Sequence, residues 1–452
     1  MVMNPTPPAP NDDAAPGPAT TGGRGGPTDP SHDIELRRGI LHTEVARPVA
    51  ALLAALFVLA IVAVPVAQAV AEKLKGDESV LPDLFRRVPT RASLRQFEDD
   101  LDKASYAREL VRPRLQALLT GHGGYGNSKA VIGRDHRWLF YQPGLLSVGG
   151  PGFLDPDALA LRSKEGVDQG SPPIHPDPRP AILALHRFLA GRGIALVIFP
   201  VPDKSALQPR ELHGRVSSAG ADPPAQNPDF PRLVAELRDA GVVVFDPTPG
   251  RIEAGAAPRF LEQDTHWTPR WMAEVAAALA QVLGERRLLP PTPAPESARA
   301  WRLAPRAVTR VGDIVDMLGL PEGQTLFAPR TITVDQVQDA AGAAFAPREG
   351  AELLLLGDSF TNVFSLGQMG WGEAAGLAPH LAHALARDVD VIAQNDSGAY
   401  ATRRLLANAL GDRDAADRLA RTKVVVWEFA SRELAVGDWK PIDWTAAARG
   451  AP

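Results

Sequence analysis

From about residue 180 onward, the apolar positions follow two alternating patterns. Segments with an apolar residue at every third or fourth position predict helices that bury one face, and short uninterrupted apolar runs predict buried strands. The helices are expected at residues 182–192, 230–240, 269–283, 377–386 and 400–410. The strands are expected at residues 194–201, 242–245, 353–356, 389–393 and 424–427. Strands that alternate with helices predict an α/β fold, with a parallel sheet flanked by helices on both faces.

The segments outside this alternation have weaker patterns. Residues 131–141 predict two short strands around a turn, with Trp138 and Phe140 in a core and His136 in the turn. Residues 286–308 are expected to be a proline-rich connection and residues 312–318 a short helix. Residues 327–335 are expected to be extended.

A long apolar segment lies near the start of the chain. Residues 49–70 carry no charged side chain and are interrupted only by Pro65 and Gln68. As a helix they would span roughly 33 Å, the thickness of a bilayer core. The segment is either an anchor that stays in the protein or a signal peptide that is cleaved after Ala67-Gln68-Ala69. The long leader and the length of the apolar run favour the anchor, with the residues that follow it outside the cell membrane.

The rest of the chain divides around this segment. Residues 1–36 are rich in Pro, Gly, Ala, Thr and Asp and hold too little apolar surface to offset the entropy of folding. We therefore expect four parts: a disordered tail (residues 1–48), a membrane anchor (49–71), a charged helical region (72–120) and one large α/β domain (121–445).

Composition excludes several classes of function. The 452 residues include no cysteine and carry a formal net charge of −5. The lack of cysteine excludes a cysteine nucleophile, disulfides and thiolate metal sites. The negative net charge gives no indication of a surface that binds nucleic acid. No His, Asp and Glu residues show metal-site spacing, and no glycine-rich run has the context of a phosphate loop, so neither a metal nor a cofactor is predicted.

The strand at 353–356 ends in a small polar turn, Gly357-Asp358-Ser359-Phe360. Such a turn presents the Ser359 hydroxyl at the carboxyl edge of the sheet, where open α/β sheets place their chemistry. Asp358 is expected to shape the turn. Capping of the next helix is the simpler role for Ser359, so catalysis also requires a base and a group that orients the base.

Residues 264–269, Asp-Thr-His-Trp-Thr-Pro, supply both groups. Thr268 before Pro269 predicts the start of a helix, so Asp264 and His266 lie in the loop that enters it. Because they are two residues apart in an extended segment, their side chains point the same way. Asp264 can then orient the imidazole of His266, whose other nitrogen can accept the serine proton. A capped loop with a surface histidine is the alternative.

Together these two segments resemble a known family. Residues 357–360 resemble the nucleophile block of SGNH hydrolases, and residues 264–267 resemble their Asp/His block. Most SGNH enzymes have the Asp/His block near the C-terminus, whereas its position before the serine is similar to that in the alginate O-acetyltransferase family of the AlgX/AlgJ type. Further segments that resemble blocks of this family are Ile132-Gly133 with Trp138-Leu139-Phe140, Val201-Pro202-Asp203-Lys204, Val311-Gly312-Asp313 with Met317-Leu318, and Val426-Trp427-Glu428-Phe429 with Arg432.

The resemblance covers about residues 125–435 and implies an SGNH-hydrolase-like catalytic domain in the periplasm, tethered to the inner membrane by an N-terminal helix. Position by position, it implies Ser359 as the nucleophile, His266 as the general base and Asp264 as the residue that orients His266. The backbone N–H of Ser359 and the amide of Asn395 would hold the oxyanion. At Asn395 an ordinary turn residue is the alternative, and the glycine usual in the family two positions earlier is replaced by alanine.

Three charged residues in these blocks have simpler interpretations. Lys204 is expected to be a solvated loop lysine, and Asp313 to cap the short helix that follows it. Arg432 is expected to form a buried ion pair with Glu428.

The resemblance implies an O-acetyltransferase that acts on an exported polysaccharide, either alginate-like or another exopolysaccharide. Ser359 would take an acetyl group supplied by a separate membrane-bound O-acyltransferase, and a sugar hydroxyl would attack the acyl-enzyme with His266 as base. A carbohydrate acetylesterase would use the same triad with water as the second nucleophile. A non-catalytic, membrane-anchored glycan-binding scaffold is the third alternative, and the presence of all three triad residues favours an enzyme over it.

Overall fold

The structure, a computed structural model, describes residues 46–77, 88, 90–168, 172–215, 221–253, 255–291, 300–395, 398–412 and 417–449. The chain divides into two compact units, Met1–Ser79 and Val80–Pro452. The disordered tail predicted for residues 1–48 lies almost entirely outside the described residues and stays a prediction.

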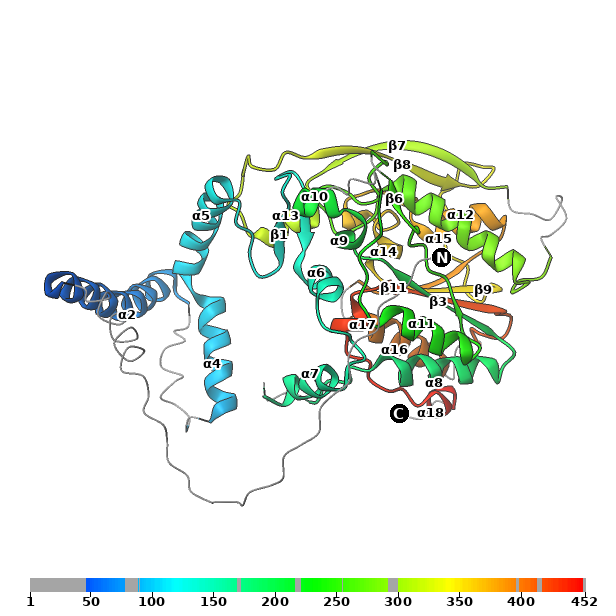
Figure 1. The fold of residues 1–452 in the computed structure, drawn as a ribbon, viewed down its shortest axis with the longest axis horizontal. Helices are drawn as coiled ribbons and strands as arrows, with labels where there is room; N and C mark the ends of the chain where they lie inside the picture. Colours follow the sequence, from blue (N-terminus) through cyan, green and yellow to red (C-terminus); the bar gives the residue numbers. More distant parts are fainter. Residues whose placement is uncertain are drawn as a thin grey trace, which may run out of the picture. The chain divides into compact units, whose positions relative to one another are not determined.

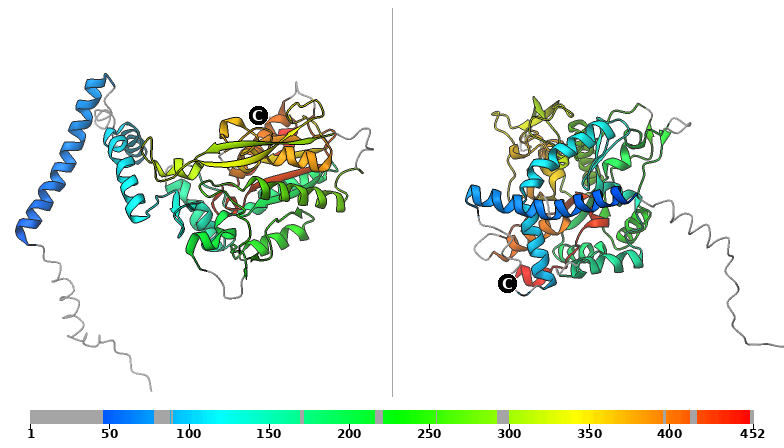
Figure 2. Two further views of the ribbon diagram at one scale, coloured as in Figure 1. Left: turned by 90° about the horizontal axis from the view of Figure 1, so that it is seen from above. Right: turned by 90° about the vertical axis from the view of Figure 1, so that its left-hand side faces the viewer.

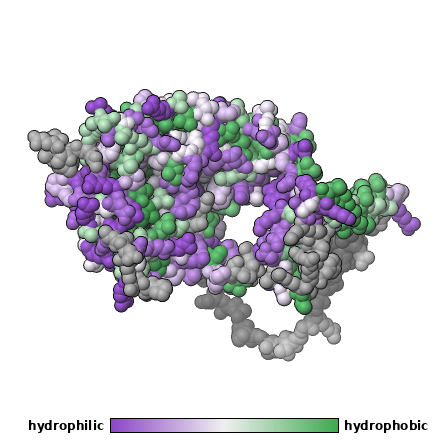
Figure 3. Space-filling view, turned by 180° about the vertical axis from the view of Figure 1, so that it is seen from behind, coloured by the Kyte–Doolittle hydropathy of each residue, from purple (hydrophilic) through white to green (hydrophobic). Residues whose placement is uncertain are grey.

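The described part of the first unit is one long helix, α2 (Arg47–Lys75). Its 29 residues make it long and apolar enough to cross a membrane, and its apolar stretch is not buried by the rest of the described chain. Figure 3 shows the surface of hydrophobic side chains on this helix in green. The helix begins with proline in its first turn and has Lys73 and Lys75 in its last turn. The prediction of a helix over residues 49–70 is confirmed.

The second unit is built on a five-stranded parallel sheet with the strand order β10-β9-β11-β3-β5. The strands are β3 (Ala195–Val201), β5 (Val243–Val244), β9 (Leu353–Gly357), β10 (Asp390–Ala393) and β11 (Val424–Ala430). The central strand β11 is buried along its whole length. Parallel strands covered on both faces have nearly continuous apolar sequences, which is why the sequence predicted them. The expected α/β fold is confirmed.

Alternate residues of each strand face two different hydrophobic cores. In β9, Leu353 and Leu355 belong to one core, and Leu354 and Leu356 belong to the other. The helices of the first core include α12 (Pro269–Glu285) and α15 (Leu377–Leu385). Those of the second include α8 (Pro178–Ala190), α11 (Phe230–Asp239) and α16 (Gly398–Gly411). Figure 1 shows these two helical layers on either side of the sheet.

A long antiparallel hairpin lies over helices α12 and α15 (Figures 1 and 2). Its strands are β7 (Arg302–Arg310) and β8 (Arg330–Gln338), and α13 (Asp313–Leu318) lies between them in sequence. The expectation that residues 286–308 form an irregular connection is therefore wrong for residues 302–308. Strand β7 is mostly exposed and contains Pro305, so it lacks the apolar alternation that marks a strand in sequence.

The remaining elements surround this framework. Helices α4 and α5, both in the predicted helical region, span Arg91–Ala104 and Tyr106–Gly123. The predicted hairpin at 131–141 is confirmed as the antiparallel pair β1 (Ala130–Ile132) and β2 (Leu139–Tyr141). The other elements are α6 (Gln142–Gly149), α7 (Pro156–Asp168), α9 (Lys204–Leu207), α10 (Pro209–His213), β4 (Ala221–Asp222), β6 (Ile252–Glu253), α14 (Ser359–Asn362), η1 (Gly367–Met369), α17 (Glu433–Val436) and α18 (Trp444–Ala448). The predicted boundaries at residues 72, 121 and 445 stay a prediction.

Strand β9 ends at a glycine because the chain folds back tightly there. A Cβ on Gly357 would lie 2.6 Å from the Cβ of Thr361 and would overlap its hydroxyl oxygen. Only glycine lets helix α14 begin this close to the end of the strand.

We predict that Gly357→Ala destabilises the protein by about 1–3 kcal/mol, because the added methyl group overpacks the turn. The matched control is Gly284→Ala in α12, where an added Cβ would meet no atom within 4 Å. That change should stabilise the protein by about 0.5–1 kcal/mol, since glycine is a poor helix former. Denaturant unfolding of the full chain in detergent, monitored by circular dichroism, measures the stability of both variants. Equal midpoints for the two variants would contradict the tight turn.

Candidate functional site

The turn after β9 places Ser359 at the carboxyl edge of the sheet, as predicted. Ser359 is the first residue of α14 and is half-buried. Asp358 shapes the turn: its Oδ1 accepts a hydrogen bond from the backbone N–H of Phe360 at 2.8 Å, and its Oδ2 accepts one from Ala430 at 2.8 Å. Both carboxylate oxygens of Asp358 are thus engaged in holding the turn against β11.

Asp264 and His266 form a buried pair in the loop before α12. Thr268 caps this helix by accepting a hydrogen bond from the backbone N–H of Trp271, which confirms the predicted helix start. The Nδ1 of His266 lies 2.6 Å from Oδ1 of Asp264, and the two residues are 4% and 1% exposed. The alternative of a surface histidine in a capped loop is therefore wrong.

Hydrogen bonds surround the Asp264 carboxylate. Oδ1 also accepts a bond from the backbone N–H of His266, and Oδ2 accepts bonds from the backbone N–H of Asp313 at 3.0 Å and from Nε1 of Trp371 at 2.8 Å. Burial by itself would raise the pKa of Asp264, but the His266 charge and these donors hold the pKa well below its usual range. Asp264 is therefore an ionised carboxylate fixed by four donors.

This carboxylate controls the charge and orientation of His266. Burial by itself would lower the pKa of His266, but the Asp264 carboxylate outweighs burial and raises the pKa above its usual value. With Nδ1 directed at Asp264, the free nitrogen of the ring is Nε2. Among the residues that the structure describes, Nε2 has no hydrogen-bond partner although it is buried.

Ser359 and His266 lie in the same part of the fold but are not hydrogen-bonded. The His266 ring packs edge-on against Phe360, the residue after Ser359, with ring centroids 4.9 Å apart. Because Nε2 lacks a partner within the described chain, the structure does not form the Ser359–His266 bond of a closed triad. Such contacts are often loose in enzymes without substrate.

Asn395 also lies beside this turn. The backbone N–H of Gln394 donates to the carbonyl of Gly357 at 3.0 Å, which joins the end of β10 to the end of β9. The Oδ1 of Asn395 accepts a hydrogen bond from Nδ2 of Asn362, three residues after Ser359, at 2.9 Å. This bond occupies the oxygen of the Asn395 amide and leaves its NH₂ group as the donor.

Comparison with known proteins identifies the fold that carries this arrangement. Residues 162–431 match the family model described as "SGNH hydrolase-like domain, acetyltransferase AlgX". The chain belongs to this AlgX family. The predicted SGNH-type acyltransferase is therefore confirmed at the level of the family, and so is the SGNH-like fold.

Individual relatives of this family can be compared with the chain. A "Probable alginate O-acetylase AlgJ" of Pseudomonas putida is 28% identical over 320 residues, which is 68% of this chain and 71% of that protein. The structure titled "O-Acetyltransferase Domain of Pseudomonas putida AlgJ" aligns with 70% of this chain and 94% of its own, at 21% identity and a TM-score of 0.46. The structure of Pseudomonas aeruginosa AlgX aligns with 72% of this chain and 66% of its own, at 18% identity and a TM-score of 0.47.

Two charged residues of the AlgX-like blocks differ from their predicted roles. Lys204 is not solvated: it is 5% exposed and its Nζ donates to backbone carbonyls. Arg432 pairs with Asp203, with 3.7 Å between NH1 and Oδ1, rather than with Glu428. Both predictions failed because they used neighbours in sequence, whereas both partners come from distant segments.

Glu428, in β11, instead holds the turn after β9 in place. Its Oε2 accepts hydrogen bonds from the backbone N–H of Asp358 at 3.1 Å and from Oγ1 of Thr361 at 2.7 Å. Burial, and then the nearby charge of Asp358, raise the pKa of Glu428 well above its usual range. Glu428 thus links the end of β11 to the turn through the two hydrogen bonds that its Oε2 accepts.

One group of residues in the described chain has metal-ligand chemistry, Asp264 with His266 and Asp313, whose ligand atoms lie within 4.8 Å of one another. These atoms already have partners. His266 Nδ1 is bound to Asp264, and the Asp313 carboxylate accepts from the backbone N–H of Thr265 at 2.7 Å and from its hydroxyl at 2.5 Å. A metal would have to displace this network, so the group is better explained as the support of a base. We call Asp264 and His266 the dyad, and residues 261–266 the dyad loop. Asp313 thus holds the dyad loop through hydrogen bonds from Thr265, a role that differs from the predicted helix cap.

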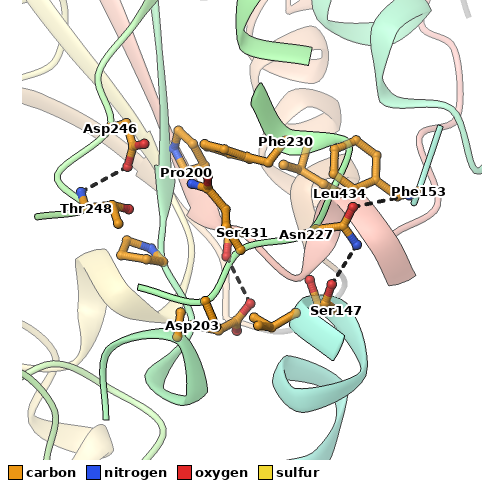
Figure 4. A pocket seen from close by; sticks show the side chains of 15 residues that line it. Ser147, Phe153, Pro200, Asp203, Asn227, Phe230, Asp246, Thr248, Ser431 and Leu434 are labelled. Atoms are coloured by element: carbon orange, nitrogen blue, oxygen red, sulfur yellow. Dashed lines mark hydrogen bonds between the residues drawn. The ribbon is translucent and has the colours of Figure 1, made fainter. Parts of the chain in front are cut away.

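Figure 4 shows a small cavity near the carboxyl ends of the central strands. In it Ser431 donates to Asp203 at 2.9 Å, and Asn227 donates to the carbonyl of Ser147 at 2.7 Å. Its volume of about 30 Å³ has room for about one water molecule, so it is too small for a sugar. A larger cavity of about 230 Å³ adjoins the dyad and is lined by Asp264 and Trp371 among others.

We predict that Trp371→Phe destabilises the protein by about 1.5–3 kcal/mol more than Trp444→Phe, because only Trp371 donates to a charged group. The Nε1 of Trp444 is buried without a partner in the described part of the chain, so its replacement removes ring area but no hydrogen bond. Denaturant unfolding of both variants measures the difference. Equal losses of stability would show that the Trp371–Asp264 bond contributes nothing.

We also predict that Asp264→Asn lowers the pKa of His266 from its raised value, because burial is then opposed only by the charges of Asp313 and Asp358. In the wild-type protein, the stability from the raised His266 pKa is fully present below the unfolded value of about 6.5 and is lost as pH rises through the folded pKa. The wild type should therefore exceed Asp264→Asn in stability by more at pH 5 than at pH 9.

Imidazole NMR titration and denaturant unfolding at the two pH values test this prediction. Asp239→Asn is the control, since Asp239 is exposed on α11. An unchanged His266 pKa in Asp264→Asn would contradict the account of the pair.

Proposed function

We propose that this chain is an O-acetyltransferase that transfers acetyl groups to hydroxyls of an exported polysaccharide, with alginate as the reference substrate. Membership of the AlgX family supports acetyl transfer, and the relative named as a probable alginate O-acetylase supports a polysaccharide acceptor. The observation that carries the proposal is the buried 2.6 Å contact between Asp264 and His266, next to the segment that begins with Ser359. In this proposal Ser359 is the nucleophile, His266 the general base and Asp264 the residue that orients it.

The first half of the reaction forms an acyl-serine. The Oγ of Ser359 attacks the acetyl carbonyl of the donor while Nε2 of His266 takes its proton. The carbonyl oxygen becomes an oxyanion, which in this proposal accepts hydrogen bonds from the backbone N–H of Ser359 and the NH₂ group of Asn395. When the intermediate collapses, the bond to the donor oxygen breaks and His266 returns the proton to the leaving group. The Ser359 side chain must first turn toward Nε2, because the two are not hydrogen-bonded in the structure.

The second half transfers the acetyl group to the acceptor. A sugar hydroxyl attacks the acyl-serine, and Nε2 of His266 takes its proton as the new ester bond forms. The bond between the acetyl carbon and Oγ of Ser359 then breaks, and the proton returns to Oγ. The positive charge that His266 carries in each half is stabilised by Asp264, which is why an ionised, fixed carboxylate suits this step.

We further propose that α2 anchors the protein in the inner membrane, with the catalytic domain of residues 121–445 in the periplasm. The length and hydropathy of α2 support the anchor. In that position a separate membrane-bound O-acyltransferase would supply the acetyl group from across the membrane. Cleavage of the segment as a signal peptide would instead release the domain.

We predict that Ser359→Ala lowers acetyl transfer by about 10⁴-fold or more, because the nucleophile of a triad acts as a unit with its base. The matched control is Ser365→Ala, a half-buried serine six residues later in the same segment, which should keep wild-type activity. The full chain in detergent is incubated with an acetyl-ester donor and an oligosaccharide, and the products are weighed by mass spectrometry.

The products separate the alternatives. Acetylated oligosaccharide supports the transferase, whereas free acetate alone would identify an acetylesterase with the same triad. Full activity in Ser359→Ala would reject Ser359 as the nucleophile. No product from the wild type would favour a non-catalytic glycan-binding scaffold.

A further inference from the structure

The loop that carries the dyad is buried without belonging to a sheet or helix. Gln263, Asp264, Thr265 and His266 are each less than 8% exposed. A single bridge between Phe260 and Trp267 closes the base of the loop. Buried backbone carbonyls need hydrogen-bond partners, and this loop obtains few of them from secondary structure.

Three of the four consecutive carbonyls from residue 261 to residue 264 accept hydrogen bonds from one side chain, Lys204. The distances from Nζ are 2.6 Å to Leu261, 2.9 Å to Glu262 and 3.2 Å to Asp264. The fourth carbonyl, of Gln263, accepts from the backbone N–H of Ile314 at 3.2 Å. The backbone that carries the Asp264 side chain is therefore held by a cation on one side and by α13 on the other.

The same ammonium also binds the loop to the β1–β2 hairpin. Nζ donates to the carbonyl of Leu139 in β2 at 2.5 Å, and it lies 5.1 Å and 5.2 Å from the ring centroids of Trp138 and Phe140. The backbone N–H of Leu139 donates in turn to Glu262 at 2.9 Å. The three N–H donors of the ammonium are thus shared among four carbonyls, and two aromatic rings lie beside it.

Strand β3 positions Lys204 next to the carbonyls of residues 261–264. The strand ends at Val201, and Lys204 opens the short helix α9 directly beneath the loop. The preceding residue, Asp203, turns the other way and contacts Ser431 and Arg432. The turn that follows β3 therefore contacts two segments: Lys204 contacts the dyad loop, and Asp203 contacts the segment after β11.

The charge of Lys204 is opposed by its burial. Burial outweighs the nearby negative charges and lowers the pKa of Lys204 to about 7. The charges that oppose burial are those of Asp264, Asp313, Glu262 and Glu211. A neutral amine has one N–H donor fewer than an ammonium. Loss of the proton therefore removes one of the bonds that hold the loop.

We propose that Lys204 is the positioning residue of the dyad: its ammonium fixes the loop at residues 261–264, so that the Asp264 carboxylate reaches Nδ1 of His266. This role rests on the proposed function only in that the dyad is taken to be the catalytic base. Lys204 does not touch the reacting atoms, so its effect reaches the reaction through Asp264 and His266. The close approach of Gly312, where an added Cβ would lie 2.7 Å from the backbone N of Asp264, limits how the loop could compensate.

The test replaces Lys204 by methionine, which keeps the volume and removes the charge, in the full chain in detergent. We expect kcat for acetyl transfer to fall by about 10²-fold, the effect of a small misplacement of a catalytic group, with KM for the donor within twofold of wild type. The low-field proton NMR signal of the His266 Nδ1–H bonded to Asp264 should be lost or shifted upfield. Lys129→Met, an exposed lysine just before β1, should change neither quantity.

A second variant keeps the test decisive if methionine is poorly tolerated. Lys204→Ala leaves a space beside the carbonyls, and a small alkylammonium ion should restore both the NMR signal and activity, whereas an alcohol of the same length should not. Wild-type kcat and an unchanged NMR signal in Lys204→Met would overturn the proposal. Global unfolding of both variants without rescue by the amine would also overturn it, because Lys204 would then serve the stability of the whole domain.

The two proposals fail in different ways. The NMR signal of the dyad reports the position of Asp264 whether or not the protein transfers acetyl groups. If Ser359→Ala retains activity while Lys204→Met loses the signal, the proposed function fails and the role of Lys204 stands.

Discussion

The buried carboxylate of Asp264 is the constraint on which the rest of the site depends. An ionised group with 1% exposure is tolerated only where donors replace its lost water. Asp264 obtains these donors from its own loop, from α13 and from Trp371, which follows η1. The site is therefore assembled from segments that lie as far as 107 residues apart in the chain.

The sheet supplies the framework that brings these segments together. Strands β9 and β11 are buried on both faces, so the turn at Asp358 and Ser359 emerges from the buried part of the sheet. Glu428 and Asp358 hold that turn from below through backbone and side-chain contacts. The dyad loop, in contrast, has little secondary structure of its own and depends on side chains that reach it from neighbouring elements. The nucleophile and the base are thus held by different means, and the gap between them is where movement during the reaction is expected.

The sequence predicted the parts of this structure that depend on local pattern. The strands at Leu353 and Val424 were evident because burial on both faces demands continuous apolar residues, and the cap at Thr268 was evident because its chemistry is local. The exposed strand β7 was missed because a polar edge strand has no such pattern.

Residues whose roles depend on distant contacts could not be recognised in this way. A lysine after a strand is usually exposed, and nothing in the sequence neighbours of Lys204 reveals the four carbonyls around it. The indole N–H of Trp371 meets Asp264 only through the tertiary fold. The sequence places Glu428 near Arg432, whereas the partner of Arg432, Asp203, lies at the end of another strand.

The central claim is that Ser359 carries the acyl group, and covalent trapping tests it most directly. The full chain is mixed with an acetyl-ester donor in the absence of acceptor, quenched in acid and digested for peptide mass spectrometry. We expect an acetyl group on Ser359 in the wild type and a much smaller amount in His266→Ala. An active enzyme that never carries an acetyl group on Ser359, or carries it on another residue, would rule out Ser359 as the nucleophile.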